Sequence, residues 1–299
     1  MSRLFGIAGV QMSVVPWNTE ATIDKMADVV KQIGLTLPWV QLVMFHELAV
    51  PGLVQFVSAE TPHAWRKSAQ PIPGPATDRL CKIARKTRKW LIPGSMYEKD
   101  GDEIYNTAIV ISPEGEIVTT YRKMFPWLPY EMGTAAGDSF CVFDIPDVGR
   151  FGLLICYDMW FPEMTRTLAW MGAEVILQPT MTPTSDRELE LVMAQASAIF
   201  NQSYFVSVNG VGPYGGGRSM IVDPDGRILQ QSGVAETILT EILDLDHVTR
   251  TREYGTLGLA QTLKQIRDSG FTFPVYENGG LSGGSFGQLG PLALHRRLE

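Results

Sequence analysis

The chain is poor in cysteine, in histidine and in long apolar runs, and each scarcity narrows what the protein can be. Its 299 residues include three cysteines and four histidines, which show neither the density of a disulfide framework nor the spacing of a metal site. No stretch has the length of a membrane span, and the N-terminus lacks a signal-peptide pattern. We therefore expect a cytoplasmic protein with no metal, no other cofactor and no membrane partner.

An excess of positive charge is lacking as well. The net charge is −7, which argues against nucleic acid as a partner. The hydrophobic share of 45% and the charged share of 19% are those of an ordinary globular protein. The length would suit either one large α/β core or two modest domains.

Apolar periodicity predicts strands and helices that alternate along most of the chain. The predicted strands cover 4–11, 41–48, 90–97, 150–156, 175–178, 204–209 and 237–244. Helices are predicted after Asn18 and over 77–89, 161–171 and 187–201, and hairpins over 105–121 and 219–231. This order indicates a layered α/β architecture in which helices cover a sheet. From residue 253 onward the pattern is irregular, so we expect an arm that crosses the surface or wraps a partner subunit.

Cys156 ends an apolar strand immediately before a predicted helix that carries Pro162 in its first turn. At such a turn the sulfur is lifted out of the sheet beside unpaired backbone N–H groups, which stabilise negative charge on sulfur or on a bound oxygen. The alternative is that Cys156 is a small buried hydrophobic residue, which is common for cysteine. This stretch alone does not decide between the two.

Two further segments bring charged residues to the ends of predicted strands. Glu47 follows His46 at the end of one strand, where catalytic groups gather in open α/β sheets, although it could equally be a carboxylate in water. The segment 121–133 mixes aromatic residues, prolines and charges, so Trp127 and Tyr130 could shape a small cavity that holds Lys123 and Glu131. The alternative is an exposed loop with a solvated lysine.

Cysteine, lysine and glutamate together suggest acyl transfer. In such chemistry a thiolate attacks a carbonyl, a carboxylate moves the proton, and an ammonium stabilises the oxyanion. His46 is expected to be a supporting or core group and not a metal ligand, because no other His/Cys cluster would complete a site.

Three ordered motifs resemble those of the nitrilase, or carbon–nitrogen hydrolase, superfamily, which uses a Glu-Lys-Cys triad. The resemblance covers about residues 4–252. The motifs are Phe45-His46-Glu47-Leu48, Tyr121-Arg122-Lys123, and Leu154-Ile155-Cys156-Tyr157-Asp158 followed by Phe161-Pro162-Glu163. The resemblance implies an α-β-β-α sandwich in residues 1–252, with residues 253–299 forming an arm at the interface of a homodimer or higher homo-oligomer.

The resemblance also implies roles for individual residues. Glu47 would be the base, Lys123 and the backbone N–H of Tyr157 the oxyanion donors, and Cys156 the nucleophile, with Glu131 placing the substrate. The predicted substrate-binding residues are Trp127, Tyr130, Tyr157, Trp160 and Met181.

Within the superfamily, the segment Lys123-Met124-Phe125-Pro126-Trp127 is most similar to aliphatic amidases and formamidases, whereas the residues around Cys156 are closer to omega-amidases. Tyr157-Asp158 stands where true nitrilases usually carry Trp-Glu, which favours an amide over a nitrile. The expected function is hydrolysis of a small non-peptide amide to a carboxylic acid and ammonia. The alternatives are an N-carbamoyl amino acid amidohydrolase, for which Arg166 or Arg187 could hold the substrate carboxylate, a nitrilase, or a catalytically silent scaffold.

Overall fold

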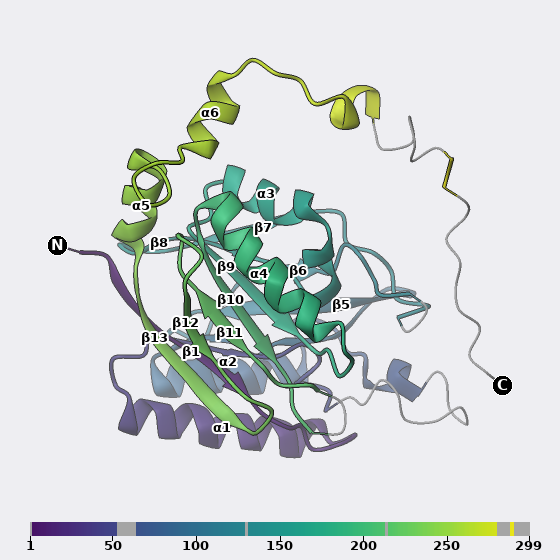
Figure 1. The fold of residues 1–299 in the computed structure, drawn as a ribbon. Helices are drawn as coiled ribbons and strands as arrows, with labels where there is room; N and C mark the ends of the chain where they lie inside the picture. The colour runs from purple at the N-terminus through teal and green to yellow at the C-terminus, as the bar shows by residue number, and fades with distance from the viewer. Residues whose placement is uncertain (1, 53–63, 129–130, 213–214, 280–287, 290–299) are drawn as a thin grey trace.

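Two β-sheets packed face to face form the centre of the computed structural model, and helices cover the outer face of each sheet (Figure 1). The structure describes residues 2–52, 64–128, 131–212, 215–279 and 288–289. The strands are β1 Leu4–Gln11, β2 Leu42–Phe45, β3 Trp90–Ile92, β4 Ser95–Asp100, β5 Glu103–Ile111, β6 Ile117–Arg122, β7 Cys141–Ile145, β8 Gly149–Leu153, β9 Val175–Thr180, β10 Tyr204–Asn209, β11 Met220–Val222, β12 Ile228–Gln231 and β13 Thr237–Asp244. The predicted α-β-β-α sandwich is confirmed.

Each sheet is mixed. The first has the order β13-β1-β2-β3-β5-β4 with β6 paired to β5, and the second has the order β12-β11-β10-β9-β8-β7. Within each sheet the parallel pairs lie at the centre, as in β1–β2–β3 and β8–β9–β10, and antiparallel strands flank them. The carboxyl ends of β2 and β9 therefore deliver the residues that follow them to the site.

The helices are α1 Thr19–Thr36, α2 Pro75–Thr87, α3 Pro162–Trp170, α4 Arg187–Asn201, α5 Leu245–Tyr254 and α6 Thr262–Asp268. As predicted, Asn18 caps α1, because its side chain accepts a hydrogen bond from the backbone N–H of Ala21. The chain beyond residue 253 is less irregular than expected, since it ends α5 and forms α6. Residues 269–279, which follow α6, arc over the molecule (Figure 1). Among the described residues, no helix is both long and apolar enough to cross a membrane.

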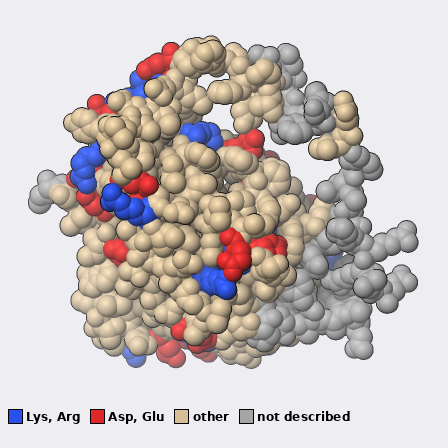
Figure 2. All heavy atoms as spheres, viewed as in Figure 1, with Lys and Arg blue, Asp and Glu red and all other residues tan. Residues whose placement is uncertain are grey.

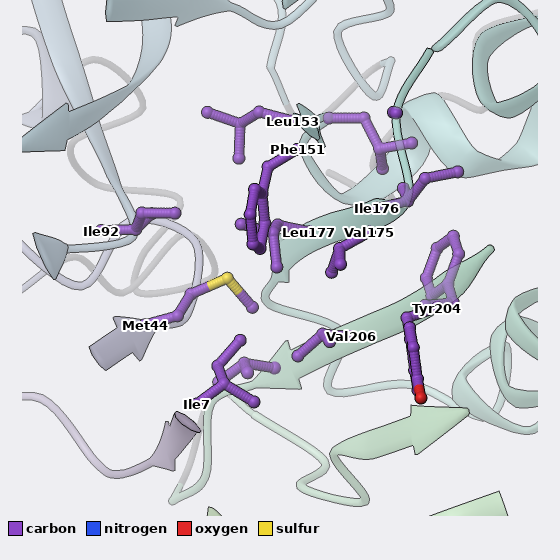
Figure 3. Close-up of a cluster of buried hydrophobic side chains, with 14 of the residues drawn as sticks. Ile7, Met44, Ile92, Phe151, Leu153, Val175, Ile176, Leu177, Tyr204 and Val206 are labelled. Carbon is purple, nitrogen blue, oxygen red and sulfur yellow. The ribbon is translucent and has the colours of Figure 1, made fainter. Parts of the chain in front are cut away.

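The core follows from the two-residue period of the strands. In β1 and β2, Ile7 and Met44 face the second sheet, whereas Val10 and Val43 pack under α1 and α2. Figure 3 shows that Ile7, Met44 and Ile92 point toward the side chains of the opposite sheet, among them Leu177 and Val206. The sheets approach so closely at Gly9 that a Cβ there would come within 2.7 Å of Val208. This packing fixes the strand ends from which the candidate site is built.

Candidate active site

Four predicted catalytic side chains meet where β2, β6 and β8 end. Glu47 follows β2, Lys123 follows β6, and Cys156 follows β8, with Glu131 eight residues beyond the lysine. All four are buried, with exposed fractions of 2% for Glu47 and Lys123, 1% for Glu131 and 7% for Cys156. Neither the solvated lysine nor the carboxylate in water that the sequence left open is found.

Lys123 sits between the two carboxylates. Its Nζ donates to Glu47 Oε1 at 2.9 Å and to Glu131 Oε2 at 2.6 Å. Asn106 on β5 joins the same pair, because its Nδ2 donates to Glu47 Oε1 at 2.9 Å and to Glu131 Oε1 at 2.8 Å. The backbone N–H of Trp127 donates to Glu131 Oε2 at 2.6 Å. Two carboxylates, one ammonium and one amide thus form a rigid buried network.

Cys156 occupies a strained turn. Its φ is +46°, a left-handed conformation that a residue with a Cβ rarely adopts, and it opens the 3-10 helix Cys156–Trp160 that precedes α3. Gln178 on β9 holds the turn through a hydrogen bond from its Nε2 to the Cys156 carbonyl at 3.1 Å. The first N–H groups of such a helix have no partner within it, so they are available to a bound oxygen.

Asp158 ties this turn to the lysine segment. Its side chain is fully buried and accepts hydrogen bonds from the Tyr121 hydroxyl at 2.7 Å, from the backbone N–H of Ile155 at 3.0 Å and from that of Phe125 at 2.9 Å. Burial raises the pKa of Asp158 to about 6 despite these donors. The aspartate therefore fixes the distance between the cysteine turn and the residues around Lys123.

Burial dominates the protonation states of the reacting groups. It raises the pKa of the Cys156 thiol well above its usual value, and the Glu47 carboxylate adds to this rise. It also raises the pKa of Glu47, against the lowering effect of Lys123. For Lys123, burial acts to lower the pKa, but Glu131 and Glu47 reverse this and hold it well above its usual value. These directions favour a protonated thiol and a charged lysine at neutral pH.

The predicted pocket residues lie around this network at different distances. Trp127 reaches it through its backbone N–H, and Tyr157 is half-buried with its ring 5.9 Å from that of Trp160. Trp160 lines a groove of about 440 Å³ between α3, α4 and the chain beyond α6. The Met181 side chain packs in a small cluster with Leu48, Tyr97 and Ile104. Tyr130 lies outside the described residues.

One group of side chains away from the site has the chemistry of a metal site. Ligand atoms of Asp223, Asp225 and His247 lie within 4.8 Å of one another. Asp225 Oδ2 lies 3.0 Å from His247 Nε2, and Asp223 Oδ1 accepts from the backbone N–H groups of Asp225 and Arg227. These contacts close the turn between β11 and β12 around Asp223 and join this turn to α5 through His247.

Sequence reasoning missed several residues of the site. Asn106 and Gln178 carry buried amides on strands where apolar residues dominate, and Thr180 and Thr182 flank the sulfur at the end of β9. A polar side chain inside an otherwise apolar strand was the available signal.

The fold and this network define a hydrolase-like α/β protein with a buried Glu-Lys-Cys cluster. The model of the carbon-nitrogen hydrolase family matches residues 6–253, and the chain belongs to this family. It is 30% identical over 239 residues to a formamidase of Bacillus cereus, covering 76% of this chain and 70% of the relative. It is 32% identical over 201 residues to omega-amidase NIT2 of Mus musculus, and the match covers 62% of this chain and 72% of the relative.

Solved structures of the nitrilase superfamily have the same fold. Nit3 of Saccharomyces cerevisiae superimposes with a TM-score of 0.75 at 26% identity, covering 84% of this chain and 93% of that one. An amidase of Nesterenkonia sp. superimposes with a TM-score of 0.71 at 25% identity, covering 84% and 94%. A variant of that amidase carries the acetamide moiety of fluoroacetamide covalently attached at its active-site cysteine.

Proposed function

We propose that the protein is an amidase that hydrolyses the C–N bond of a small non-peptide amide to a carboxylic acid and ammonia through a Cys156 thioester. The observation that carries the proposal is the buried network in which Lys123 Nζ bridges Glu47 and Glu131 beside the Cys156 thiol. A formamidase and an omega-amidase among the relatives support an amide as the substrate.

In the first half of the reaction, the sulfur of Cys156 attacks the amide carbon while Glu47 takes the thiol proton. The carbonyl electron pair moves to oxygen, and the charged oxygen is stabilised by the Lys123 ammonium and the backbone N–H of Tyr157. Glu47 then gives the proton to the amide nitrogen as the C–N bond breaks, so that ammonia leaves and a thioester remains.

In the second half, Glu47 takes a proton from water, and the resulting hydroxyl attacks the thioester carbon. The C–S bond breaks, the sulfur recovers the proton from Glu47, and the carboxylic acid leaves. In these steps Glu131 contacts neither the substrate oxygen nor the Cys156 sulfur. It holds Lys123 and the backbone of Trp127, and through them the placement of the acyl group.

The alternatives within hydrolases receive less support. A carbamoyl amino acid needs a cation for its carboxylate, but Arg187 is buried in an ion pair with Glu190 at 2.9 Å. Arg166 lines the outer groove with Trp160. A nitrilase is favoured by none of the relatives named above, and a silent scaffold would not need to keep four charged or nucleophilic groups buried together.

The test is ammonia release from a panel of short amides, N-carbamoyl amino acids and nitriles, with mass spectrometry of Cys156 after acid quenching. We expect turnover of amides and a Cys156 adduct with the mass of the acyl group. Cys156→Ser should abolish both, whereas Cys81→Ser, which changes another free cysteine, should keep them. Turnover of nitriles alone, or amide turnover without an adduct, would overturn the proposal.

A homo-oligomer formed through α3 and α4, with residues 253–299 as an arm at the interface, is part of the same proposal. These helices expose Trp170, Leu189, Val192 and Phe200, and uncharged residues cover much of the face that Figure 2 shows. Apolar patches of this kind commonly mark interfaces. Light scattering coupled to size exclusion would measure the assembly, and a monomer at micromolar concentration would contradict it.

A further inference from the structure

Two threonines at the end of β9 lie close to the reactive sulfur. Thr182 Oγ1 lies 4.0 Å from Cys156 Sγ and 3.1 Å from Thr180 Oγ1. A hydrogen bond between Thr180 and Cys156 lowers the pKa of the thiol, against the effect of burial. Both threonines are buried, so their hydroxyl groups need hydrogen-bond partners inside the protein.

The backbone of this segment is held in place from both sides. Asn209 at the end of β10 accepts from the backbone N–H of Thr182 at 2.9 Å and donates to its carbonyl at 3.0 Å. The Thr180 carbonyl accepts from the backbone N–H of Glu47 at 3.3 Å. The backbone that carries the two hydroxyls is therefore held in place relative to the base, while the hydroxyl hydrogens can still rotate.

A buried ion pair decides which hydroxyl can donate to the sulfur. Arg187 donates to Glu190 Oε2 at 2.9 Å, and Glu190 Oε1 accepts the hydroxyl of Thr182 at 2.9 Å. An ionised carboxylate only accepts hydrogen bonds, and a threonine hydroxyl has a single hydrogen. Since Thr182 gives that hydrogen to Glu190, its oxygen can only accept from Thr180 or from the thiol.

We infer that Thr180 is the hydrogen-bond donor to the Cys156 sulfur when it becomes negatively charged, and that Glu190 fixes this direction by holding the hydrogen of Thr182. In the thiol state the Thr180 hydroxyl donates to Thr182. When the proton leaves the sulfur, the same hydroxyl turns to the thiolate, because a bond to a charged acceptor is stronger. Thr182 and Glu190 are positioning residues, which act on the sulfur through Thr180.

Other charges also face the sulfur, so the effect of Thr180 is one among several. Glu47 raises the pKa of the thiol, Lys123 lowers it and Glu190 raises it. Arg187 forms an ion pair with Glu190, and the charge of the Cys156 thiolate raises the pKa of Arg187. A substitution that changes no charge, such as threonine to valine, isolates the hydrogen bond from these electrostatic effects.

This inference rests on the proposed function, in which Cys156 becomes charged during attack, but its test does not need amide turnover. The rate of reaction of Cys156 with methyl methanethiosulfonate is measured from pH 6 to 10, with the modified peptide quantified by mass spectrometry. The reagent is not an amide and reacts with the thiolate. A protein that reacts normally here but releases no ammonia would contradict the proposed function alone.

Thr180→Val should raise the pKa of this reaction by about one unit, which lowers the rate about tenfold wherever the thiol is mostly protonated. Thr180→Ser keeps the hydroxyl and should stay close to the wild type. Thr182→Val removes the acceptor for Thr180 and the donor to Glu190, but it removes no donor to the sulfur, so it should not raise the pKa. If Thr180→Val does not fold, Thr180→Ala takes its place, and it should raise the pKa of the reaction by the same amount.

The opposite pattern would overturn the inference. If Thr182→Val raised the pKa and Thr180→Val did not, Thr182 would be the donor, and an unchanged profile in Thr180→Val would remove any role for Thr180. The role of Glu190 is tested by combining Thr180→Val with Glu190→Gln, because a glutamine can donate to Thr182 and so free the hydrogen of Thr182 for the sulfur. In the Glu190→Gln background, Thr180→Val should then raise the pKa of the reaction less than it does in the wild type. Fully additive changes in this pKa would exclude the positioning role of Glu190.

Discussion

Replacing Glu131 with glutamine tests the charge balance of the site. The carboxylate accepts three hydrogen bonds, from Lys123, Asn106 and the backbone N–H of Trp127. Glutamine has nearly the same shape, but one of its two terminal groups donates and cannot accept. The lysine keeps Glu47 as its only carboxylate among the described residues, and the net charge of the buried cluster rises by one.

The magnitude follows from the contacts. Removing one partner of a buried ion pair costs about 3–5 kcal/mol of stability. Glu47 and Glu131 contact the same amide nitrogen at 2.9 and 2.8 Å, inside the range of about 6 Å over which a like charge raises a carboxyl pKa. Without Glu131, one cause of the raised pKa of Glu47 disappears, so this pKa should fall.

The assay is the pH dependence of kcat/KM for a short amide. We expect the acidic limb to move to lower pH and the maximum to fall about 100-fold, since Glu47 becomes a weaker base and Lys123 loses an anchor. Glu98→Gln is the matched control. Glu98 is also buried and accepts from Arg122 Nε at 2.9 Å and Thr107 Oγ1 at 2.7 Å. It should lose stability without moving the limb. A limb that stayed in place or moved upward in Glu131→Gln would refute the reasoning.

Three further predictions concern other parts of the molecule. Burial lowers the pKa of His46 to about 4, so stability present at neutral pH should be lost as the pH falls and the unfolded chain takes up a proton. Between pH 7 and 4.5 this loss is about 2.4 kcal/mol, and His46→Gln should remove it. Urea unfolding at these two pH values measures the loss, and an equal loss in both proteins would contradict the prediction. Tyr121→Phe removes one of the three hydrogen-bond donors to Asp158 and should lower the free energy of unfolding by about 1–3 kcal/mol. Thermal unfolding measures this loss, and an unchanged stability would contradict a structural role for the hydrogen bond. Val192→Glu on α4 should dissociate the proposed oligomer, which light scattering would detect. Val234 is about as exposed and lies between β12 and β13, so Val234→Glu should leave the oligomer intact. Dissociation by both substitutions would argue against this interface.

Sequence reasoning predicted the strand ends better than it predicted burial. Cys156 and Glu47 were placed at strand ends by the apolar runs before them, and both lie there. Whether Glu47 was in water could not be predicted, because its partners come from distant parts of the chain. Asn106 and Lys123 bond its carboxylate, and the Thr180 carbonyl accepts its backbone N–H. Long-range packing of this kind has no local signature.

The errors of element prediction have similar causes. One predicted strand over 90–97 is in fact two, β3 and β4, and β7 over Cys141–Ile145 was not predicted at all. The burial of β7 alternates between core and surface over five residues, which is a weak pattern beside the apolar runs of the central strands. Edge strands of this kind depend on their neighbour, here β8, more than on their own composition.

The same contacts explain why this cysteine would use a carboxylate and not an imidazole as its base. With both carboxylates ionised, Glu47, Lys123 and Glu131 carry one net negative charge beside a thiol whose pKa burial raises, so a resting thiolate would be doubly disfavoured. The proton should therefore leave only as the amide oxygen becomes negative next to Lys123, and the total charge of the cluster stays constant through the attack. Ultraviolet difference spectra of the wild type against Cys156→Ser should then contain no thiolate absorbance at neutral pH, and such absorbance would mean that the sulfur is activated before the substrate arrives.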